Sequence, residues 1–156
     1  MIRPTLSEDT PSLLRLAERT GVFKPPEIVA LREVLDDLHA TNHALGHRSI
    51  TYEAGATIAG FAYFAPAAMT DRTWHLYWIA VEKATQSQGI GGQLLVFLEA
   101  EIRRLHGRQM LIETSSLPHY DPTRRFYLKH GYESAAVVPD YYAAGDHMVI
   151  FRKRFE

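Results

Sequence analysis

The sequence contains no cysteine among its 156 residues. This absence excludes disulfide bonds, thiolate metal ligands and a cysteine nucleophile, so any catalysis must use other groups. An excess of charge of either sign is also missing, because 17 Lys and Arg residues stand against 18 Asp and Glu residues. A nearly neutral chain lacks the field that recruits nucleic acid or an anionic membrane, which favours a small partner.

Long apolar runs are lacking as well. No stretch approaches the roughly 20 apolar residues that cross a membrane, and residues 1–13 contain no apolar signal core. We therefore expect a cytoplasmic protein. With 46% hydrophobic and 22% charged residues, the composition fits one globular domain over residues 1–156.

The spacing of apolar residues predicts an alternation of helices and strands. Apolar residues recur at intervals of three and four in the expected helices, and β-branched and aromatic residues cluster in the expected strands. The expected helices are 11–20, 25–38, 90–105 and 122–130, and the expected strands include 2–6, 49–54, 57–65, 72–81, 109–114 and 148–154. The order βααβββαβαββ predicts an α/β (α+β) fold with a mixed sheet of about seven strands flanked by about four helices.

The most informative stretch is a glycine-rich segment, Gln86 to Gln93, between a strand that ends at Val81 and a helix that begins at Ile90. Glycines have no Cβ, so backbone N–H groups can approach a phosphate closely, and the helix dipole favours negative charge there. The segment therefore predicts an anion site that a pyrophosphate would fit. The alternative is a glycine-rich turn that only starts a helix.

Two other phosphate-binding loops are disfavoured by the spacing. A dinucleotide loop, G-x-G-x-x-G, would follow the strand closely and would need a glycine three residues after Gly91, where the sequence has Leu94. A nucleoside-triphosphate loop would end in Gly-Lys-Ser/Thr, whereas Gly92 is followed by Gln93.

Two motifs together resemble those of the GNAT (Gcn5-related N-acetyltransferase) family. Gln86, Gly89 and Gly91 match the Q/R-x-x-G-x-G/A signature, and residues 126–132, FYLKHGY, resemble the F-Y-x-x-x-G-F/Y element. Their order and spacing also match, which makes the pair more specific than either motif alone. The specific part of the resemblance covers residues 74–133, and the order of elements extends it loosely to the whole chain.

The resemblance implies a mostly antiparallel GNAT-type sheet and acetyl-CoA as the cosubstrate, with no metal. In the family, loop amides hold the coenzyme pyrophosphate and the fourth strand binds pantetheine through its open edge. The cofactor-binding residues implied here are Ile79, Ala80, Val81, Gln86, Ser87, Gln88, Gly89, Ile90, Gly91, Gly92, Gln93, Phe126 and Tyr127. The second motif departs from the family at Thr123, which replaces an alanine, so no pantetheine contact is assigned to Tyr120 or Asp121.

Tyr127 matches the general acid that the family commonly uses to protonate the departing sulfur. The alternative is an aromatic packing residue on a short helix. For the general base, the candidates are Glu113 near the end of strand 109–114 and His75 in strand 72–81, with His119 as a weaker third. Each of these also has a structural interpretation, as a surface or paired charge or as a satisfied histidine.

Two further segments attract attention. His39, His43 and His47 recur every four residues, but Gly46 argues against a helix and no carboxylate accompanies them, so we expect a solvated helix end rather than a metal site. An alternative hypothesis gives these histidines a part in choosing the substrate.

Residues 138–146 are predicted to form a loop whose tyrosines either close over an acceptor or pack on the sheet edge or on a second subunit.

These features predict an acetyl-CoA-dependent N-acetyltransferase that modifies a primary amine by direct attack in a ternary complex, since no cysteine can carry the acetyl group. The acceptor is a small-molecule or peptide amine. The Tyr141-Tyr142 segment resembles that of relatives that acetylate protein N-termini, whereas the near-neutral charge suits a small amine. The alternative is a non-catalytic acyl-CoA-binding sensor of the same fold. Nucleic-acid and membrane partners are not expected, and the resemblance allows a homodimer.

Overall fold

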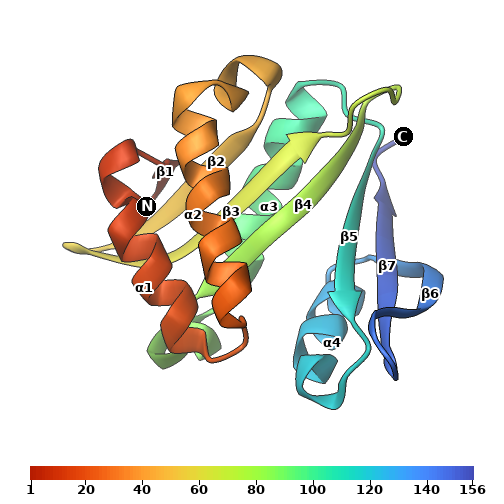
Figure 1. Ribbon diagram of the computed structural model, residues 1–156. Helices are drawn as coiled ribbons and strands as arrows, with labels where there is room; N and C mark the ends of the chain where they lie inside the picture. The colour runs from red at the N-terminus through yellow and green to blue at the C-terminus, as the bar shows by residue number, and fades with distance from the viewer. The chain divides into compact units, whose positions relative to one another are not determined.

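Seven strands form a sheet with the order β1-β2-β3-β4-β5-β7-β6 in the computed structural model (Figure 1). The structure describes the backbone of residues 1–156 and every side chain except that of Ser87. Strands β4 and β5 are parallel, whereas the β1–β2, β2–β3, β5–β7 and β6–β7 pairs are antiparallel. The strands are β1 (Ile2–Pro4), β2 (Arg48–Ala54), β3 (Thr57–Pro66), β4 (Thr73–Val81), β5 (Gln109–Ser115), β6 (Glu133–Ala143) and β7 (Asp146–Arg154).

Four α-helices accompany the strands in the described chain: α1 (Thr10–Thr20), α2 (Pro25–Ala40), α3 (Ile90–Arg104) and α4 (Asp121–Lys129). The predicted α/β fold, with a mostly antiparallel sheet of about seven strands and about four helices, is therefore confirmed. None of these helices, over the residues that the structure describes, has the length and apolar character that crossing a membrane requires.

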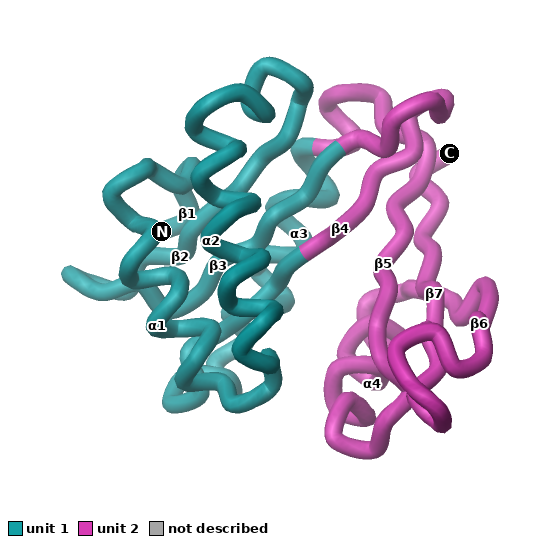
Figure 2. Tube along the Cα trace, in the orientation of Figure 1, with its two compact units in different colours: residues 1–65, 78–101 teal, residues 66–77, 102–156 magenta. Residues whose placement is uncertain are grey.

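The chain divides into two compact units (Figure 2). Unit 1 comprises residues 1–65 and 78–101, and unit 2 comprises residues 66–77 and 102–156. Strand β4 contributes to both, because residues 73–77 belong to unit 2 and residues 78–81 to unit 1.

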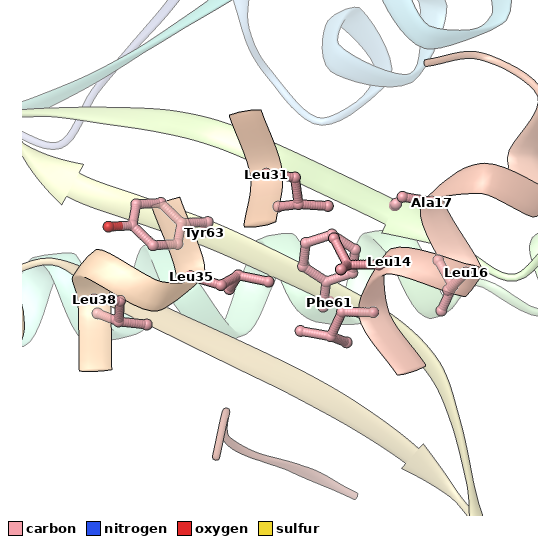
Figure 3. Packing of buried hydrophobic residues seen from close by; sticks show 10 residues of the cluster. Leu14, Leu16, Ala17, Leu31, Leu35, Leu38, Phe61 and Tyr63 are labelled. Atoms are coloured by element: carbon pink, nitrogen blue, oxygen red, sulfur yellow. The ribbon is translucent and has the colours of Figure 1, made fainter. Parts of the chain in front are cut away.

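In unit 1, the apolar faces of α1 and α2 pack on one side of strand β3 (Figure 3). Phe61 and Tyr63 are two residues apart in β3 and therefore point to the same side of the strand. Helix α1 ends before Gly21, whose φ of 70° is left-handed, and α2 begins at Pro25, whose fixed φ suits a first turn. The buried cluster comprises Leu13, Leu14, Leu16, Ala17, Leu31, Leu35, Leu38, Phe61, Tyr63 and Ala80.

The other side of β3 faces the start of α3, and Gly60 marks their close approach. A Cβ placed at Gly60 would lie 3.1 Å from Leu94 Cδ1 and 3.2 Å from Ile90 Cγ2, both on α3. It would also lie 3.2 Å from the carbonyl oxygen of Ala80 in β4. The first turn of α3 can therefore pack this closely only because residue 60 has no side chain.

In unit 2, helix α4 packs on one face of the β5–β7 ladder. Ile112 of β5 is opposite Phe151 of β7, and the ring of Phe151 lies 5.6 Å from that of Tyr127 on α4. Successive strand residues point to opposite faces of the sheet, and Ile112 and Phe151 lie on the face that α4 covers. The residues next to them in each strand therefore lie on the face away from α4. By strand register, that face carries His75, Tyr77, Leu111, Glu113, Ile150 and Arg152.

The prediction of a loop over residues 138–146 is wrong for most of its length, because β6 extends to Ala143 and β7 begins at Asp146. The ladder pairs Val138 with Met148 and then Ala143 with Asp146, so residues 139–142 bulge out of the strand. Pro139 lacks a backbone donor, which explains why regular pairing is interrupted there. The bulge leaves Tyr141 and Tyr142 exposed by 57% and 44%.

Replacing Gly60 with alanine is expected to destabilise unit 1, because the new methyl group must push Leu94, Ile90 or the β4 backbone away. Overpacking of this kind costs about 1–3 kcal/mol in free energy of unfolding. For a chain of this size, the midpoint of thermal unfolding should fall by about 2–4 °C for each kcal/mol. Calorimetry would measure the change, and an unaltered midpoint would show that α3 can shift away without cost.

Candidate functional site

The loop between β4 and α3 is held in shape by backbone hydrogen bonds. The amide of Glu82, just after β4, donates to the carbonyl of Ala59 at 2.8 Å, and the amide of Thr85 donates to the carbonyl of Glu82 at 2.9 Å. The chain then forms a short 3-10 turn, Lys83–Gln88, and passes through Gly89 with a left-handed φ of 75°. That φ is readily available only to glycine, so Gly89 allows the turn to lead directly into α3.

Two side chains tie this loop to the rest of unit 1. Arg19 at the end of α1 forms an ion pair with Glu82, with 2.7 Å between Arg19 Nη2 and Glu82 Oε2. The side-chain amide of Gln86 donates to the carbonyl oxygen of Val81 at 3.3 Å. Gln86 therefore supports the loop from the end of β4.

The N-terminal turn of α3 is suited to an anion. The amide of Gln93 donates to the carbonyl of Gly89 at 3.1 Å, which closes the first helical turn. In an α-helix, the amides before this bond have no helical partner and point out of the N-terminal end, where the helix dipole adds positive potential. The side chain of Ile90 is only 2% exposed, so its contribution to an anion site would come from the main chain.

The other predicted loop residues have different surroundings. Gln88 and Gly89 are exposed, and a Cβ at Gly89 would meet open space, so the approach to this backbone is clear. Gly91 and Gly92 are half-buried and Gln93 is exposed. The predicted contact of the Ser87 side chain lies outside the described residues.

Residues 79–81 of β4 precede this loop. Ala80 is 6% exposed and belongs to the unit 1 core, whereas Ile79 and Val81 are half-buried. Trp78 lies beside them with its ring 5.2 Å from that of Phe23. The Ala80 side chain is thus occupied by packing, which leaves its main-chain atoms for any contact with a ligand.

Tyr127 lies on α4 and is 4% exposed. Its ring is surrounded by the rings of Phe126, Tyr132 and Phe151 at 5.5, 6.0 and 5.6 Å. Burial among apolar rings disfavours the phenolate and raises the pKa of Tyr127 well above its ordinary value. The phenol therefore keeps its proton over the whole physiological pH range. Phe126 also packs on His130, with 4.6 Å between the ring centroids.

The two base candidates, His75 and Glu113, lie on the same face of unit 2. His75 is half-buried and stacks on Tyr77, with 5.4 Å between centroids and 20° between planes. Glu113 is exposed and lies opposite Ile150 in the β5–β7 ladder. We call the surface that carries His75, Tyr77, Glu113, Tyr142 and Ile150 the Glu113 face. The weaker candidate, His119, is exposed and its ring lies 4.5 Å from that of Tyr120.

Tyr77 and Tyr142 are members of this face that sequence reasoning did not assign to it. Burial raises the pKa of Tyr77, and the negative charge of Glu113 raises it further. The pKa of Tyr142 is raised to about 12, mainly by burial and next by the negative charge of Glu113. Smaller effects come from Tyr141, Asp146 and Tyr120. Strand alternation could have placed Tyr77 beside His75, but the approach of Tyr142 depends on the bulge in β6.

A buried polar pair lies at the end of the same face. Ser115 and Asp146 are 7% and 6% exposed, and Ser115 Oγ donates to Asp146 Oδ1 at 2.5 Å. Ser115 Oγ accepts the amide proton of Leu117 at 3.0 Å, so its own proton is directed to the carboxylate. The pair anchors the start of β7 to the end of β5.

The three histidines at intervals of four residues do not converge. His39 lies in α2, His43 lies in a 3-10 turn, and Gly46 has a left-handed φ of 91° before His47. The Nδ1 atom of His47 lies 2.7 Å from the hydroxyl oxygen of Tyr63, and burial lowers the pKa of His47. Among the residues that the structure describes, no three His, Asp or Glu side chains form a potential metal site.

Comparisons with known proteins bear on this arrangement. The chain matches the family model of the acetyltransferase (GNAT) domain over residues 46–134. It is similar to a solved structure from Desulfovibrio desulfuricans described as a GNAT-family acetyltransferase, with 34% identity, a TM-score of 0.95, and coverage of 99% of this chain and 98% of that chain. No curated protein matches the sequence.

Two more distant structures share the fold. The ribosomal-protein-S18-alanine N-acetyltransferase of Escherichia coli has 19% identity and a TM-score of 0.79, with 100% of this chain and 94% of that chain covered. The protein yncA of Salmonella typhimurium, solved with its cofactor acetyl-CoA, has 19% identity, a TM-score of 0.82 and the same coverage of both chains.

The buried phenol of Tyr127 leads to a prediction about alkaline stability. Its pKa is raised above the unfolded value of ~10, so above that pH the unfolded chain loses this proton while the folded chain keeps it. The contribution of this phenol to the free energy of unfolding is complete below pH ~10. It is lost by about 1.4 kcal/mol per pH unit as the pH rises towards the pKa of Tyr127 in the folded protein.

The Tyr127→Phe variant should therefore lose less stability than the wild type above pH ~10. Denaturant unfolding at a series of alkaline pH values would measure the difference in slope. Tyr141→Phe, which removes an exposed hydroxyl, is the matched control and should follow the wild type. Parallel slopes for wild type and Tyr127→Phe would contradict the account of burial given above.

Proposed function

The chain belongs to the GNAT family of acetyltransferases, and we propose that it is an acetyl-CoA-dependent N-acetyltransferase that acts on a primary amine. The observation that carries this proposal is the glycine-bordered start of α3, where backbone amides point out of the helix and Ile90 is anchored at Gly60. Such a terminus suits a pyrophosphate, because it offers several donors and a positive dipole end at once.

Acetyl transfer sets three requirements for the protein. When bound, acetyl-CoA supplies a thioester whose carbon–sulfur bond breaks as the neutral amine nitrogen attacks the carbonyl carbon, yielding an amide and a thiol. The protein must accept the proton that the nitrogen loses, stabilise the negative charge on the carbonyl oxygen, and protonate or hydrogen-bond the sulfur. With no cysteine in the chain to carry the acetyl group, we propose direct attack in a ternary complex.

Main-chain groups are proposed to bind the coenzyme. The amides from Gln88 to Gln93 are assigned to the pyrophosphate, and the exposed backbone at Gly89 supports this assignment. Main-chain atoms of residues 79–81 are assigned to pantetheine and to the thioester oxygen. The buried side chain of Ala80 is consistent with a purely main-chain role at that position.

Side chains of unit 2 are proposed to move the protons. Tyr127 is assigned as the donor to sulfur, because burial keeps its hydroxyl protonated. The phenolate of Tyr127 would be a stronger base than the departing thiolate, for which a cysteine thiol with a pKa near ~8.5 is the model. Complete proton transfer from Tyr127 to sulfur is therefore unfavourable, and the main contribution of the phenol is a hydrogen bond to the developing charge. Either His75 or Glu113 is assigned as the base.

The acceptor is proposed to be a small amine in preference to a protein. The near-neutral net charge of −1 supports a small partner. A homodimer and a cytoplasmic location remain predictions from sequence.

Titration calorimetry with acetyl-CoA tests the cofactor assignment. Wild-type protein should bind with micromolar affinity, and Gly91→Glu should weaken binding by about tenfold or more, because its carboxylate repels the pyrophosphate. Ala100→Glu is the matched control, since it puts the same charge on an exposed position about 13 Å farther along α3. Lack of binding by the folded wild type would refute the proposed function.

Steady-state kinetics of Tyr127→Phe test the proton donor. We expect kcat to fall by about 10²-fold while the KM for acetyl-CoA stays close to that of the wild type, because only the stabilisation of the sulfur is lost. Thiol release with a panel of amines is the measurement. An unaltered kcat would make Tyr127 a packing residue, and acetyl-CoA binding without turnover on any amine would favour the non-catalytic sensor.

A further inference from the structure

Helix α4 is short and buries little of its own surface. Only one of its nine residues, Tyr127, is buried. Isolated helices shorter than about 12 residues are marginal in water, so α4 depends on contacts with the rest of unit 2. On its buried side, the ring of Tyr127 packs among apolar rings such as that of Phe151, 5.6 Å away. Apolar burial is non-directional, so this contact alone does not fix the rotation of the helix.

Arg124 supplies a directional contact between α4 and the end of β5 (Figure 1). Its Nη1 atom donates to the carbonyl oxygen of Ser115 at 2.6 Å and to that of Leu117 at 3.0 Å. Ser115 is the last residue of β5, and Leu117 lies in the turn that leads to α4. The side chain of Arg124 is only 19% exposed, so water competes weakly for these bonds. Hydrogen bonds from a charged donor are also stronger than those between neutral groups.

The turn that Arg124 holds is itself tied to β7. Ser115 Oγ donates to the buried carboxylate of Asp146 at 2.5 Å. The amide of Ser116 donates to the carbonyl of His147 at 2.9 Å, and the amide of His147 donates to Ser116 Oγ at 2.8 Å. Arg124 therefore links α4 to a turn whose position is determined by the sheet of unit 2.

The hydroxyl of Tyr127 depends on this link for its position. Among the residues that the structure describes, none forms a hydrogen bond with that hydroxyl. A buried tyrosine usually bonds its hydroxyl to a partner, so here the place of the hydroxyl follows from the place of α4. Arg124 and Tyr127 are three residues apart and lie on one side of the helix, about 4.5 Å apart along its axis. A shift of the helix at Arg124 is therefore passed directly to the phenol.

We propose that Arg124 is a positioning residue for acetyl transfer, which fixes where Tyr127 presents its hydroxyl by holding the carbonyls of Ser115 and Leu117. This inference rests on the proposed function, in which that hydroxyl bonds to the departing sulfur. Arg124 itself touches no reacting atom and transfers no proton. A displacement of about 1 Å can cost a catalytic group about 10²-fold in rate, so loosening of α4 lowers kcat more than it weakens coenzyme binding.

Arg125 provides a matched control for Arg124. Both arginines lie beside Asp121, with Arg125 Nη2 2.6 Å from Oδ2 and Arg124 Nη2 3.6 Å from Oδ1. The side chain of Arg125 is 78% exposed, and it forms no hydrogen bond with the described residues of the turn. Replacing either arginine with methionine removes one charge and one ion pair, but only Arg124→Met removes the bonds to the two carbonyls.

Steady-state kinetics with acetyl-CoA and a reactive amine compare these variants. Arg124→Met should lower kcat by about tenfold or more and change the KM for acetyl-CoA by less than about twofold. Arg125→Met should leave both constants close to those of the wild type. Arg124→Lys keeps a cationic donor without the planar fork, and its kcat should lie between those of Arg124→Met and the wild type. Equal kcat values for Arg124→Met and Arg125→Met would overturn the proposal.

A double-variant cycle separates positioning of the hydroxyl from a general loosening of the fold. In Tyr127→Phe the hydroxyl that Arg124 positions is absent, so adding Arg124→Met should lower kcat by less than about twofold further. A full additional loss in the double variant would show that Arg124 acts independently of the hydroxyl and would overturn the proposal. Thermal unfolding checks that each variant is folded, and Arg124→Lys replaces Arg124→Met in the cycle if the latter does not fold.

NMR of protein labelled with 13C-tyrosine tests the position of Tyr127 without turnover. The ring signal of Tyr127 is the one that Tyr127→Phe lacks. It should shift or broaden in Arg124→Met and stay in place in Arg125→Met, and an unchanged signal in Arg124→Met would overturn the inference.

The outcomes distinguish this inference from the proposed function. If acetyl-CoA fails to bind, the proposed function fails and the positioning role fails with it. If Tyr127→Phe keeps its full kcat, the role of Tyr127 is refuted, and that of Arg124 falls as well. If the rate falls in Tyr127→Phe but not in Arg124→Met, only the inference about Arg124 is refuted.

Discussion

The close approach of α3 to β3 at Gly60 is the constraint on which the anion-binding loop depends. Leu94 and Ile90 reach the strand there because no side chain intervenes, and they hold the first turn of α3 against the core of unit 1. The direction of the amides at the helix start follows from that contact, since a rigid helix transmits the position of its buried residues to its end. A site made of backbone atoms is therefore specified by side chains buried behind it.

Unit 2 contains two contrasting environments for ionisable groups. Tyr127 lies among aromatic rings that exclude water, so its proton is retained and its hydroxyl can only donate over the physiological range. Glu113 is exposed, and its negative charge raises the pKa of Tyr77 and Tyr142. The buried phenol can thus hydrogen-bond to charge that develops beside it with little competition from water, whereas the exposed carboxylate is screened by solvent.

Sequence reasoning succeeded where the signal is local. The helix that starts at Ile90 and the turn at Gly89 follow from glycine spacing and apolar periodicity over a short window, and both are found in the structure. It was wrong about residues 138–143, whose pairing depends on Met148 and Asp146 in a different strand. The cluster of Tyr77, Glu113 and Tyr142 was also missed, because strand register and a bulge bring these residues together and neither leaves a periodic pattern.

The bulge at residues 139–142 has a consequence for how such a protein can diverge. The ladder resumes at Ala143 and Asp146 beyond the bulge, and Pro139 to Tyr142 make no contribution to the regular pairing. Insertions and replacements there would leave the core and the loop before α3 intact. The exposed surface that Tyr141 and Tyr142 form can therefore vary among related sequences without altering the buried cluster of unit 1 or the backbone that leads into α3.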